Sequence, residues 1–496
     1  MGLIRLAVLL LALAGAALSV WRLEAGRSGL IVTPLTVGTT PATVWRLPGD
    51  APAPVIVIAH GFAGSRPLMD SIAMTLARAG YIAVSYDLMG HGRNPVPMSG
   101  DVTRIDGTTT LLMDELARVP DVAMTLPGAV GRLALVGHSM ASDIVVRQAI
   151  RDPRVQAVVA LSMFSGAVTA DQPRNLLVIA GEWEGFLSAE ALRALRLADP
   201  AASLGQTLTN AKGARRALAA PQVEHVGILF SGTMLAEMQG WLNTVFARDM
   251  APPIQRRGGW IALLLVSVVA MAWPLAGFLC RWRAAEPPLR VGRGMFALAV
   301  LGPAIATPLL LWPFDTRFLP VLVADYLSLH LALYGILGLG ILAGAGGLRR
   351  MAPVVPLLAL PVMAFAIVIF GGVLDRTFAS FVPVAGRIPV VAAMALGAVP
   401  FMLADGALTE GGRAPLWRVL VVRAAALASL GAAVALDVER LFFLLMILPV
   451  ILIFFLLFGT LGGWVGRATW RPGVAGIALG VFLGWALGVT FPMFAA

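Results

Sequence analysis

Cysteine and lysine are almost missing from this sequence of 496 residues. The single cysteine, Cys280, excludes an internal disulfide framework and any metal site built from several cysteines. Because Lys212 is the only lysine, arginine accounts for most of the net charge of +10, and the arginines are spread thinly along the chain. No basic block or aromatic-interleaved basic patch is present, so we expect no nucleic-acid partner.

Charged residues are also scarce. They make up 13% of the chain, whereas 58% of the residues are hydrophobic and the mean hydropathy is +0.85. A soluble domain usually has about 25% charged residues, so much of this chain is expected to lie in lipid. From Trp260 onward, eight apolar segments each approach the roughly 20 residues needed to cross a bilayer. They are 260–280, 295–314, 318–342, 354–374, 388–408, 416–436, 441–465 and 474–494.

A further apolar stretch, 6–21, follows Arg5. It is typical of a signal peptide or of an uncleaved anchor, and the small residues Ala14 and Ala16 would permit cleavage. We favour the anchor. The predicted organisation is an anchor helix at 1–25, a domain at 26–250 and a membrane domain of about eight helices at 258–496.

The distribution of arginine predicts the orientation, because positively charged loops tend to stay in the cytoplasm. With the amino terminus inside, ten arginines fall in cytoplasmic connections and four in the opposite ones. The ten are Arg281, Arg283, Arg290, Arg293, Arg349, Arg350, Arg413, Arg418, Arg467 and Arg471; the four are Arg317, Arg376, Arg387 and Arg440. Arginines 22, 27, 256 and 257 oppose this orientation, but they flank a long domain, where the rule has less weight. We therefore predict a multi-pass protein, typical of a bacterial inner membrane, with its 26–250 domain outside the cytoplasm.

The 26–250 domain has a different hydropathy pattern from the membrane half. Short apolar runs at 55–60, 82–87, 132–137, 157–162 and 175–181 alternate with amphipathic stretches at 68–80, 103–125, 141–151 and 188–197. This alternation predicts a mostly parallel sheet with flanking helices. Only a dozen residues separate the last two apolar runs, so no large cap is expected over the sheet.

The run LALVGHSMAS, residues 133–142, places Ser139 directly after a predicted strand and before a predicted helix. In the G-x-S-x-G pattern such a serine stands on a sharp turn, and small residues on either side allow the helix to pack tightly against the strand. Gly137 meets this requirement, and Ala141 replaces the second glycine with one added methyl group. A serine needs a nearby base, a group that orients the base and donors for the oxyanion before it can act as a nucleophile.

These motifs resemble the α/β-hydrolase superfamily over about residues 30–248. The resemblance rests on VIVIAHGFAGS (55–65), YDLMGHGRN (86–94) and the Ser139 turn, and it implies an α/β-hydrolase fold with a triad in the order nucleophile, acid, histidine. It implies that Ser139 is the nucleophile and His225 the base, and that the backbone N–H groups of Phe62 and Met140 form the oxyanion hole. Of the five histidines, only His225 satisfies the order.

The acid has two candidates. Glu184 follows the NLLVIAG run at the position where the family usually has aspartate, and Glu182 is the alternative. Either glutamate could instead be a solvated loop charge.

Two polar residues stand out in the membrane half. Asp325 and His330 lie five residues apart on one predicted helix, and ionisable groups in lipid are costly and often functional. They suggest a polar cavity or a proton route, or else two groups satisfied by hydrogen bonds between helices.

The sequence thus favours a membrane-anchored serine hydrolase that cleaves an ester or thioester through an acyl-enzyme, without a cofactor or a metal. Because the domain is tethered to eight helices, a lipidic or amphiphilic substrate is plausible. Two alternatives stay open. The same nucleophile could serve an acyltransferase, and a degenerate hydrolase-like domain could serve a transporter or sensor.

Overall fold

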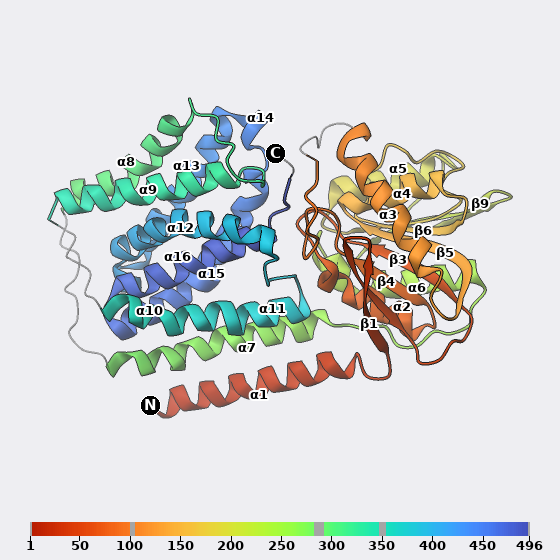
Figure 1. Ribbon diagram of the computed structural model, residues 1–496, viewed down its shortest axis with the longest axis horizontal. Helices are drawn as coiled ribbons and strands as arrows, with labels where there is room; N and C mark the ends of the chain where they lie inside the picture. The colour runs from red at the N-terminus through yellow and green to blue at the C-terminus, as the bar shows by residue number, and fades with distance from the viewer. Residues whose placement is uncertain (1, 100–104, 282–291, 347–353, 495–496) are drawn as a thin grey trace.

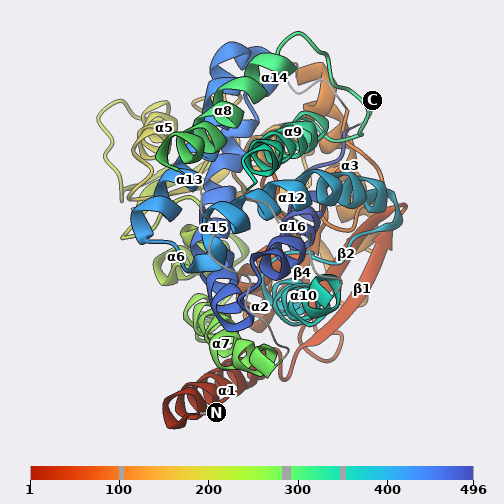
Figure 2. The same ribbon diagram turned by 90° about the vertical axis from the view of Figure 1, so that its left-hand side faces the viewer.

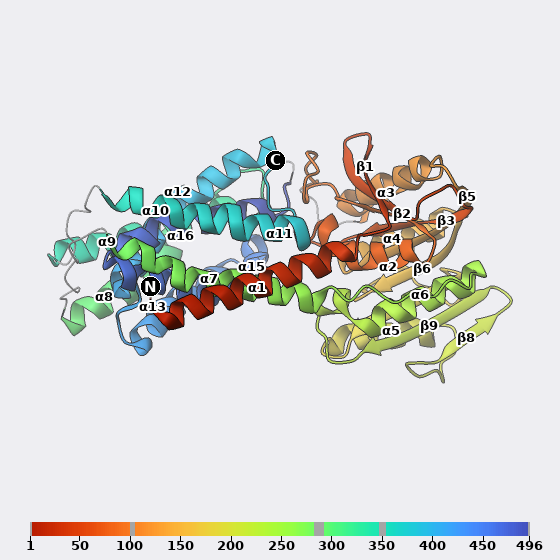
Figure 3. The ribbon, with the colours of Figure 1, turned by 90° about the horizontal axis from the view of Figure 1, so that it is seen from below.

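The computed structural model describes residues 2–99, 105–281, 292–346 and 354–494. Two regions lie next to each other: a bundle of long helices, and a sheet with helices packed on it (Figure 1). The chain enters the sheet region from α1 (Leu3–Ala25) and leaves it through α7 (Gly258–Ala276). These two helices run side by side (Figures 1 and 3), and Gly15 of α1 lies against Ser267 of α7.

The sheet has nine strands in the order β1-β2-β4-β3-β5-β6-β7-β9-β8. The strands are β1 (Ile31–Val37), β2 (Thr40–Arg46), β3 (Ala53–Ala59), β4 (Ile82–Tyr86), β5 (Ala129–His138), β6 (Val155–Leu161), β7 (Asn175–Gly181), β8 (Thr207–Asn210) and β9 (Gly213–Ala220). The six strands from β4 to β9 in this order are parallel, and β1, β2 and β8 are antiparallel additions at the two edges. The predicted mostly parallel sheet is confirmed.

Both faces of the sheet are covered by helices. They are α2 (Asp70–Arg78), α3 (Thr110–Ala123), α4 (Met140–Arg151), α5 (Gly185–Arg196) and α6 (Gly232–Phe246). One hydrophobic cluster packs α3, α4 and α5 against one face, and a second packs α2 and α6 against the other. Residues 162–174, between β6 and β7, contain no helix, so the described chain has no large cap there, as predicted.

Nine helices in the described ranges are long and apolar enough to cross a membrane. Besides α1 and α7 they are α8 (Arg293–Leu311), α9 (Ala324–Gly344), the span Val355–Thr377 that includes α10 (Val354–Ala364) and α11 (Gly371–Thr377), α12 (Ile388–Leu408), α13 (Leu416–Leu436), α15 (Leu444–Thr469) and α16 (Pro472–Thr490). A short helix, α14 (Val438–Leu441), joins α13 to α15. Each predicted apolar segment corresponds to one of these spans.

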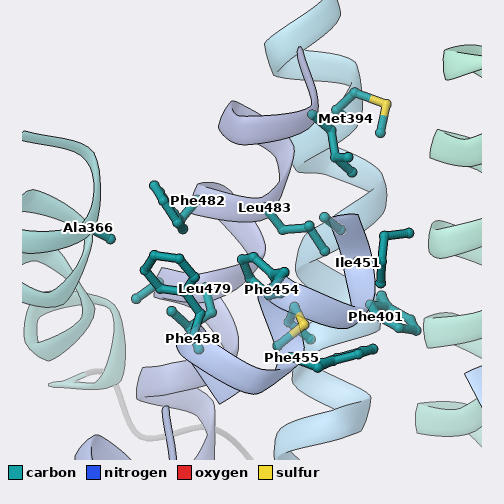
Figure 4. Close-up of a cluster of buried hydrophobic side chains, with 14 of the residues drawn as sticks. Ala366, Met394, Phe401, Ile451, Phe454, Phe455, Phe458, Leu479, Phe482 and Leu483 are labelled. Carbon is teal, nitrogen blue, oxygen red and sulfur yellow. The ribbon is translucent and has the colours of Figure 1, made fainter. Parts of the chain in front are cut away.

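Aromatic rings fill the centre of the bundle. The ring of Phe482 on α16 lies 4.4 Å from that of Phe458 on α15, and Phe454 stacks nearby (Figure 4). Seen end on, α16 lies among α10, α12 and α15 (Figure 2). This helix is therefore the most enclosed part of the bundle, with 67% of its span buried.

The carboxyl ends of the parallel strands face the helical bundle. Ser65, beyond β3, accepts a hydrogen bond from the N–H of Ser380, and Arg93, beyond β4, forms an ion pair of 2.6 Å with Asp375. The carboxyl-terminal segment lies between the two regions (Figure 1), where the N–H of Met493 donates to the carbonyl oxygen of Gly90. The edge of the sheet where the predicted site residues lie is therefore docked onto the bundle.

Candidate active site

Ser139 lies on a strained turn between β5 and α4. Its φ of 55° and ψ of −121° place a non-glycine residue in a sparsely populated region of backbone space. A Cβ on Gly137 would lie 2.4 Å from the carbonyl oxygen of Ala141, so only glycine fits there. Ala141 itself is fully buried, and its methyl group is accommodated in the core beneath the turn. The sequence GHSMA therefore forms the tight strand-to-helix turn that G-x-S-x-G usually forms.

His225 contacts both expected partners. Its Nε2 lies 2.8 Å from the Ser139 hydroxyl oxygen, and its Nδ1 lies 2.5 Å from Oε1 of Glu184. The three side chains follow the carboxyl ends of β5, β7 and β9. In the sheet β7 and β9 are adjacent, and β6 lies between β5 and β7. With Nδ1–H donating to the carboxylate, Nε2 is free to accept the hydroxyl proton. The predicted meeting of these three residues is present.

Glu184 is held in place on both carboxylate oxygens. Its Oε2 accepts hydrogen bonds from the N–H of Gly181 at 2.6 Å and from the hydroxyl of Ser162 at 2.7 Å. Burial by itself raises the pKa of Glu184, but the bonds from His225, Gly181 and Ser162 outweigh it and hold the pKa below its usual value. The carboxylate is therefore ionised near neutral pH.

Glu182 points elsewhere. It is exposed, and its Oε2 accepts a hydrogen bond from the N–H of Gln222. The structure thus brings Glu184, and not Glu182, to the imidazole of His225.

A second histidine supports the loop that holds His225. His138 is buried, and its Nε2 lies 2.8 Å from the carbonyl oxygen of His225, to which it can donate. Burial, and to a smaller extent the nearby His225, lower the pKa of His138 to about 3. His138 is therefore neutral over the physiological range and orients His225 without taking up a proton.

The two predicted oxyanion donors lie on either side of Ser139. Met140 follows it at the start of α4, and Gly61, which precedes Phe62, packs against it so closely that an added Cβ would lie 2.9 Å from the Ser139 Cβ. Among the described residues, no acceptor contacts the N–H of Phe62 or of Met140. Two free N–H groups beside a strained serine are the geometry that stabilises a developing oxyanion.

The loop that holds Phe62 is fixed from below by a buried carboxylate. Asp87 accepts hydrogen bonds from the N–H and Nε of Arg66, at 2.8 and 2.9 Å, and from the N–H of Arg93. Gly92, with φ of +53°, lets the chain pass so near Asp87 that any Cβ would clash. The YDLMGHGRN segment therefore shapes the site without touching the nucleophile.

The mouth of the site is partly open and aromatic. The His225 side chain is 43% exposed, so solvent reaches the nucleophile–base pair. Three aromatic side chains are exposed: Phe164 on the loop after β6, Trp183 on the loop after β7, and Phe186 at the start of α5. We did not identify them from the sequence, because a single aromatic in a loop does not reveal which neighbours it will join.

Asp325 and His330 lie apart from this site. Both Asp325 oxygens accept backbone hydrogen bonds, from the N–H groups of Phe318 and Tyr326. His330 is hydrogen-bonded to Ser429 of α13 at 3.1 Å, a contact between helices. Asp325 lines a cavity. In the described chain, no group of three or more His, Cys, Asp or Glu residues is placed to hold a metal ion.

The sheet region matches one known protein family. Residues 50–228 match the family described as serine aminopeptidase, S33. No curated protein matches the chain. Among solved structures, a methylesterase is 16% identical with a TM-score of 0.34, covering 52% of this chain and 69% of its own. A hypothetical protein from Pseudomonas aeruginosa is 12% identical (TM-score 0.33; 44% and 94% covered), and a protein from Thermus thermophilus is 16% identical (TM-score 0.32; 44% and 99% covered).

The family match and the strand order together identify the sheet region as an α/β-hydrolase domain. A helical region with long apolar helices follows it. The chain therefore combines a serine-type hydrolase fold with a set of candidate membrane spans.

Proposed function

We propose that this protein is a membrane-embedded serine hydrolase that cleaves ester or thioester bonds through an acyl-enzyme on Ser139. The observation that supports the proposal best is the continuous hydrogen-bonded line from the Ser139 hydroxyl through His225 to Glu184. A serine hydroxyl becomes nucleophilic when such a base accepts its proton, and an ionised carboxylate stabilises the imidazolium that results.

In the proposed reaction, the Ser139 oxygen attacks the substrate carbonyl while its proton passes to Nε2 of His225. The N–H groups of Phe62 and Met140 stabilise the negative oxygen of the tetrahedral intermediate. His225 then gives the proton to the leaving alcohol or thiol, which leaves an acyl-Ser139. A water molecule, deprotonated by His225, releases the acid and restores the serine. With an alcohol in place of water the same steps give acyl transfer.

A fluorophosphonate probe applied to membranes tests the proposal, because it phosphonylates only an activated serine. We expect labelling that is abolished by Ser139→Ala and His225→Ala and retained in Ser203→Ala, which changes an exposed serine between α5 and β8. An unlabelled protein with intact folding would contradict the proposal. It would favour the alternative of a transporter or sensor with an inactive domain.

The leaving group is tested separately. The matched family is described as an aminopeptidase, so a panel should compare acyl esters, acyl thioesters and aminoacyl anilides. We expect the esters or thioesters to give the highest kcat/KM. A preference for aminoacyl anilides would show that the enzyme cleaves amide bonds and not esters or thioesters. The proposed role of Ser139 as nucleophile would be unaffected.

We also propose that the hydrolase domain lies outside the cytoplasm of a bacterial inner membrane. The support is the excess of arginine in the connections at the opposite end of the bundle. Two arginines that oppose this orientation, Arg27 and Arg257, form ion pairs with the buried Asp70 at 2.8 and 3.1 Å. Their presence near the membrane is therefore explained by folding, independently of topology.

A further inference from the structure

A cavity of about 780 Å³ lies at the end of the bundle that faces the sheet. It is partly open, and it is bounded by the connection between α8 and α9 and by the region where α13 meets α14. Apolar side chains such as Trp312, Leu436 and Phe443 line it, together with the exposed charged side chains of Asp315 and Arg317. Small-molecule sites commonly have volumes of about 300–1,000 Å³. The size and the mixed lining suit an amphiphile with a long apolar part.

None of the triad side chains lines this cavity, but apolar contacts connect the two places. The Phe62 ring lies 5.5 Å from the ring of Phe443, which lines the cavity. Leu322 and Phe494, which also line it, belong to the same hydrophobic cluster as Phe62 and Met140. The two residues that supply the proposed oxyanion donors are thus linked to the cavity by side chains alone.

The connection is closed at one point. Between Phe62 and the cavity lies a void of only about 10 Å³, bounded by Leu322, Phe443 and Phe494. A void of this size holds at most one water molecule. An acyl chain can therefore pass only when the Phe443 ring or the Phe494 ring turns aside.

We propose that this cavity binds the acyl chain of the substrate, so that a long-chain acyl ester reaches Ser139 with its tail held between α8, α9 and α13. The inference rests on the proposed function, because it assigns the substrate class of that same site. It explains why the carboxyl edge of the sheet is docked onto the bundle. The membrane helices then supply the apolar surface that a cap supplies in a free-standing enzyme.

Chain-length kinetics provide the first test. Burial of each added methylene is expected to raise kcat/KM about threefold to fourfold until the cavity is full. Leu436→Trp narrows the cavity and should lower the ratio of kcat/KM for a twelve-carbon ester to that for a four-carbon ester by at least about tenfold. The control is Leu420→Trp, on the same helix but exposed and outside the cavity, which should leave that ratio unchanged. Equal ratios in the two variants would overturn the inference.

Chemical cross-linking provides the second test. A long-chain alkyl fluorophosphonate with a diazirine at the chain end should phosphonylate Ser139 and, on illumination, cross-link to residues 312–326 or 433–443. Labelling at Ser139 with cross-links to the exposed Phe164, Trp183 or Phe186 would overturn the inference and leave the proposed function standing. A folded protein that is not labelled at Ser139 would overturn the proposed function, and the assignment of a substrate chain with it.

Discussion

Glu182 and Glu184 differ by two positions and occupy different environments. Glu184 contacts the His225 ring and accepts two further hydrogen bonds, whereas Glu182 is exposed and accepts one backbone bond. A buried carboxylate held by three donors needs no reorganisation before it can stabilise an imidazolium, which is the role proposed for Glu184.

This contrast predicts the outcome of two matched substitutions. Glu184→Gln removes the charge beside His225 and allows the wrong tautomer, and should lower kcat by on the order of 10³- to 10⁴-fold. Glu182→Gln should change kcat by less than about threefold, because Gln222 can still donate to the amide oxygen. Steady-state hydrolysis of a four-carbon ester measures both. A larger loss in the Glu182 variant would transfer the role of the acid to that residue.

His138 predicts a pH dependence of stability. Its pKa in the folded protein is about 3, against about 6.5 in an unfolded chain, because it is buried. Between these values the unfolded chain binds a proton that the folded chain does not, so its contribution to stability falls as the pH drops below about 6.5. Well below pH 6.5, this effect lowers the free energy of unfolding by about 1.4 kcal/mol for each pH unit.

The measurement is thermal unfolding in detergent at a series of pH values between 7.5 and 5. His138→Gln retains a donor toward the carbonyl oxygen of His225 but cannot titrate. Its Tm should therefore fall less steeply with acidification than that of the parent. Burial lowers the pKa of His60 and His91 too, so some acid sensitivity should persist in the variant. Parallel curves of Tm against pH for the parent and the variant would show that His138 does not contribute to the acid sensitivity.

At the scale of elements, α16 depends on a row of glycines spaced four residues apart. An added Cβ on Gly476, Gly480, Gly484 or Gly488 would lie 2.3 to 3.0 Å from the backbone or side chains of α12 and its neighbours. Small residues at this spacing allow two helix backbones to approach closely in a membrane. The spacing is visible in the sequence, and we missed it because a row of glycines does not show which other helix packs against it.

A single substitution tests this packing. At Gly484 even an added Cβ would lie 2.3 Å from the N of Ala395. Gly484→Leu should therefore destabilise the protein by about 3 kcal/mol or more. Gly431→Leu on α13 is the matched control, because nothing lies within 4 Å of its Cβ position. The yield of folded protein and the Tm in detergent measure the difference. Equal behaviour would show that α12 and α16 do not pack this closely.

At the scale of the whole molecule, one buried arginine joins the two regions. Arg387, at the start of α12, donates through Nη2 to the carbonyl oxygen of Gly90 at 2.7 Å, and through Nη1 to that of Phe491. It therefore bonds to the turn after β4 and to the carboxyl-terminal segment together. A charged group buried at 1% exposure is retained only where such acceptors surround it.

The orientation across the membrane is a prediction at the same scale. In a Cys280→Ser background, a cysteine at Ser203 on the hydrolase domain should react with a membrane-impermeant maleimide in intact spheroplasts. A cysteine at Gly292, at the start of α8 and the opposite end of the bundle, should react only after permeabilisation. The reverse pattern would place the hydrolase domain in the cytoplasm.

Much of the fold could be predicted because its signals are local. The five strands from β3 to β7 are continuous apolar runs, and the membrane spans are long enough to stand out by composition. The hairpin of β1 and β2 was missed because both strands contain proline and β1 is mostly exposed, so neither shows a regular apolar pattern.

The sequence by itself determined the type of fold, the number of apolar spans and the candidates for nucleophile, base and acid, since these follow from motifs and periodicity within short windows. Only the tertiary structure showed that Glu184, and not Glu182, contacts His225. The two residues are so close in sequence that only the directions of their side chains distinguish them. The tertiary structure alone also placed the cavity of the bundle beside the loop that holds Phe62. That contact joins Phe62 to Phe443. A local sequence pattern cannot predict a contact between residues so far apart in the chain.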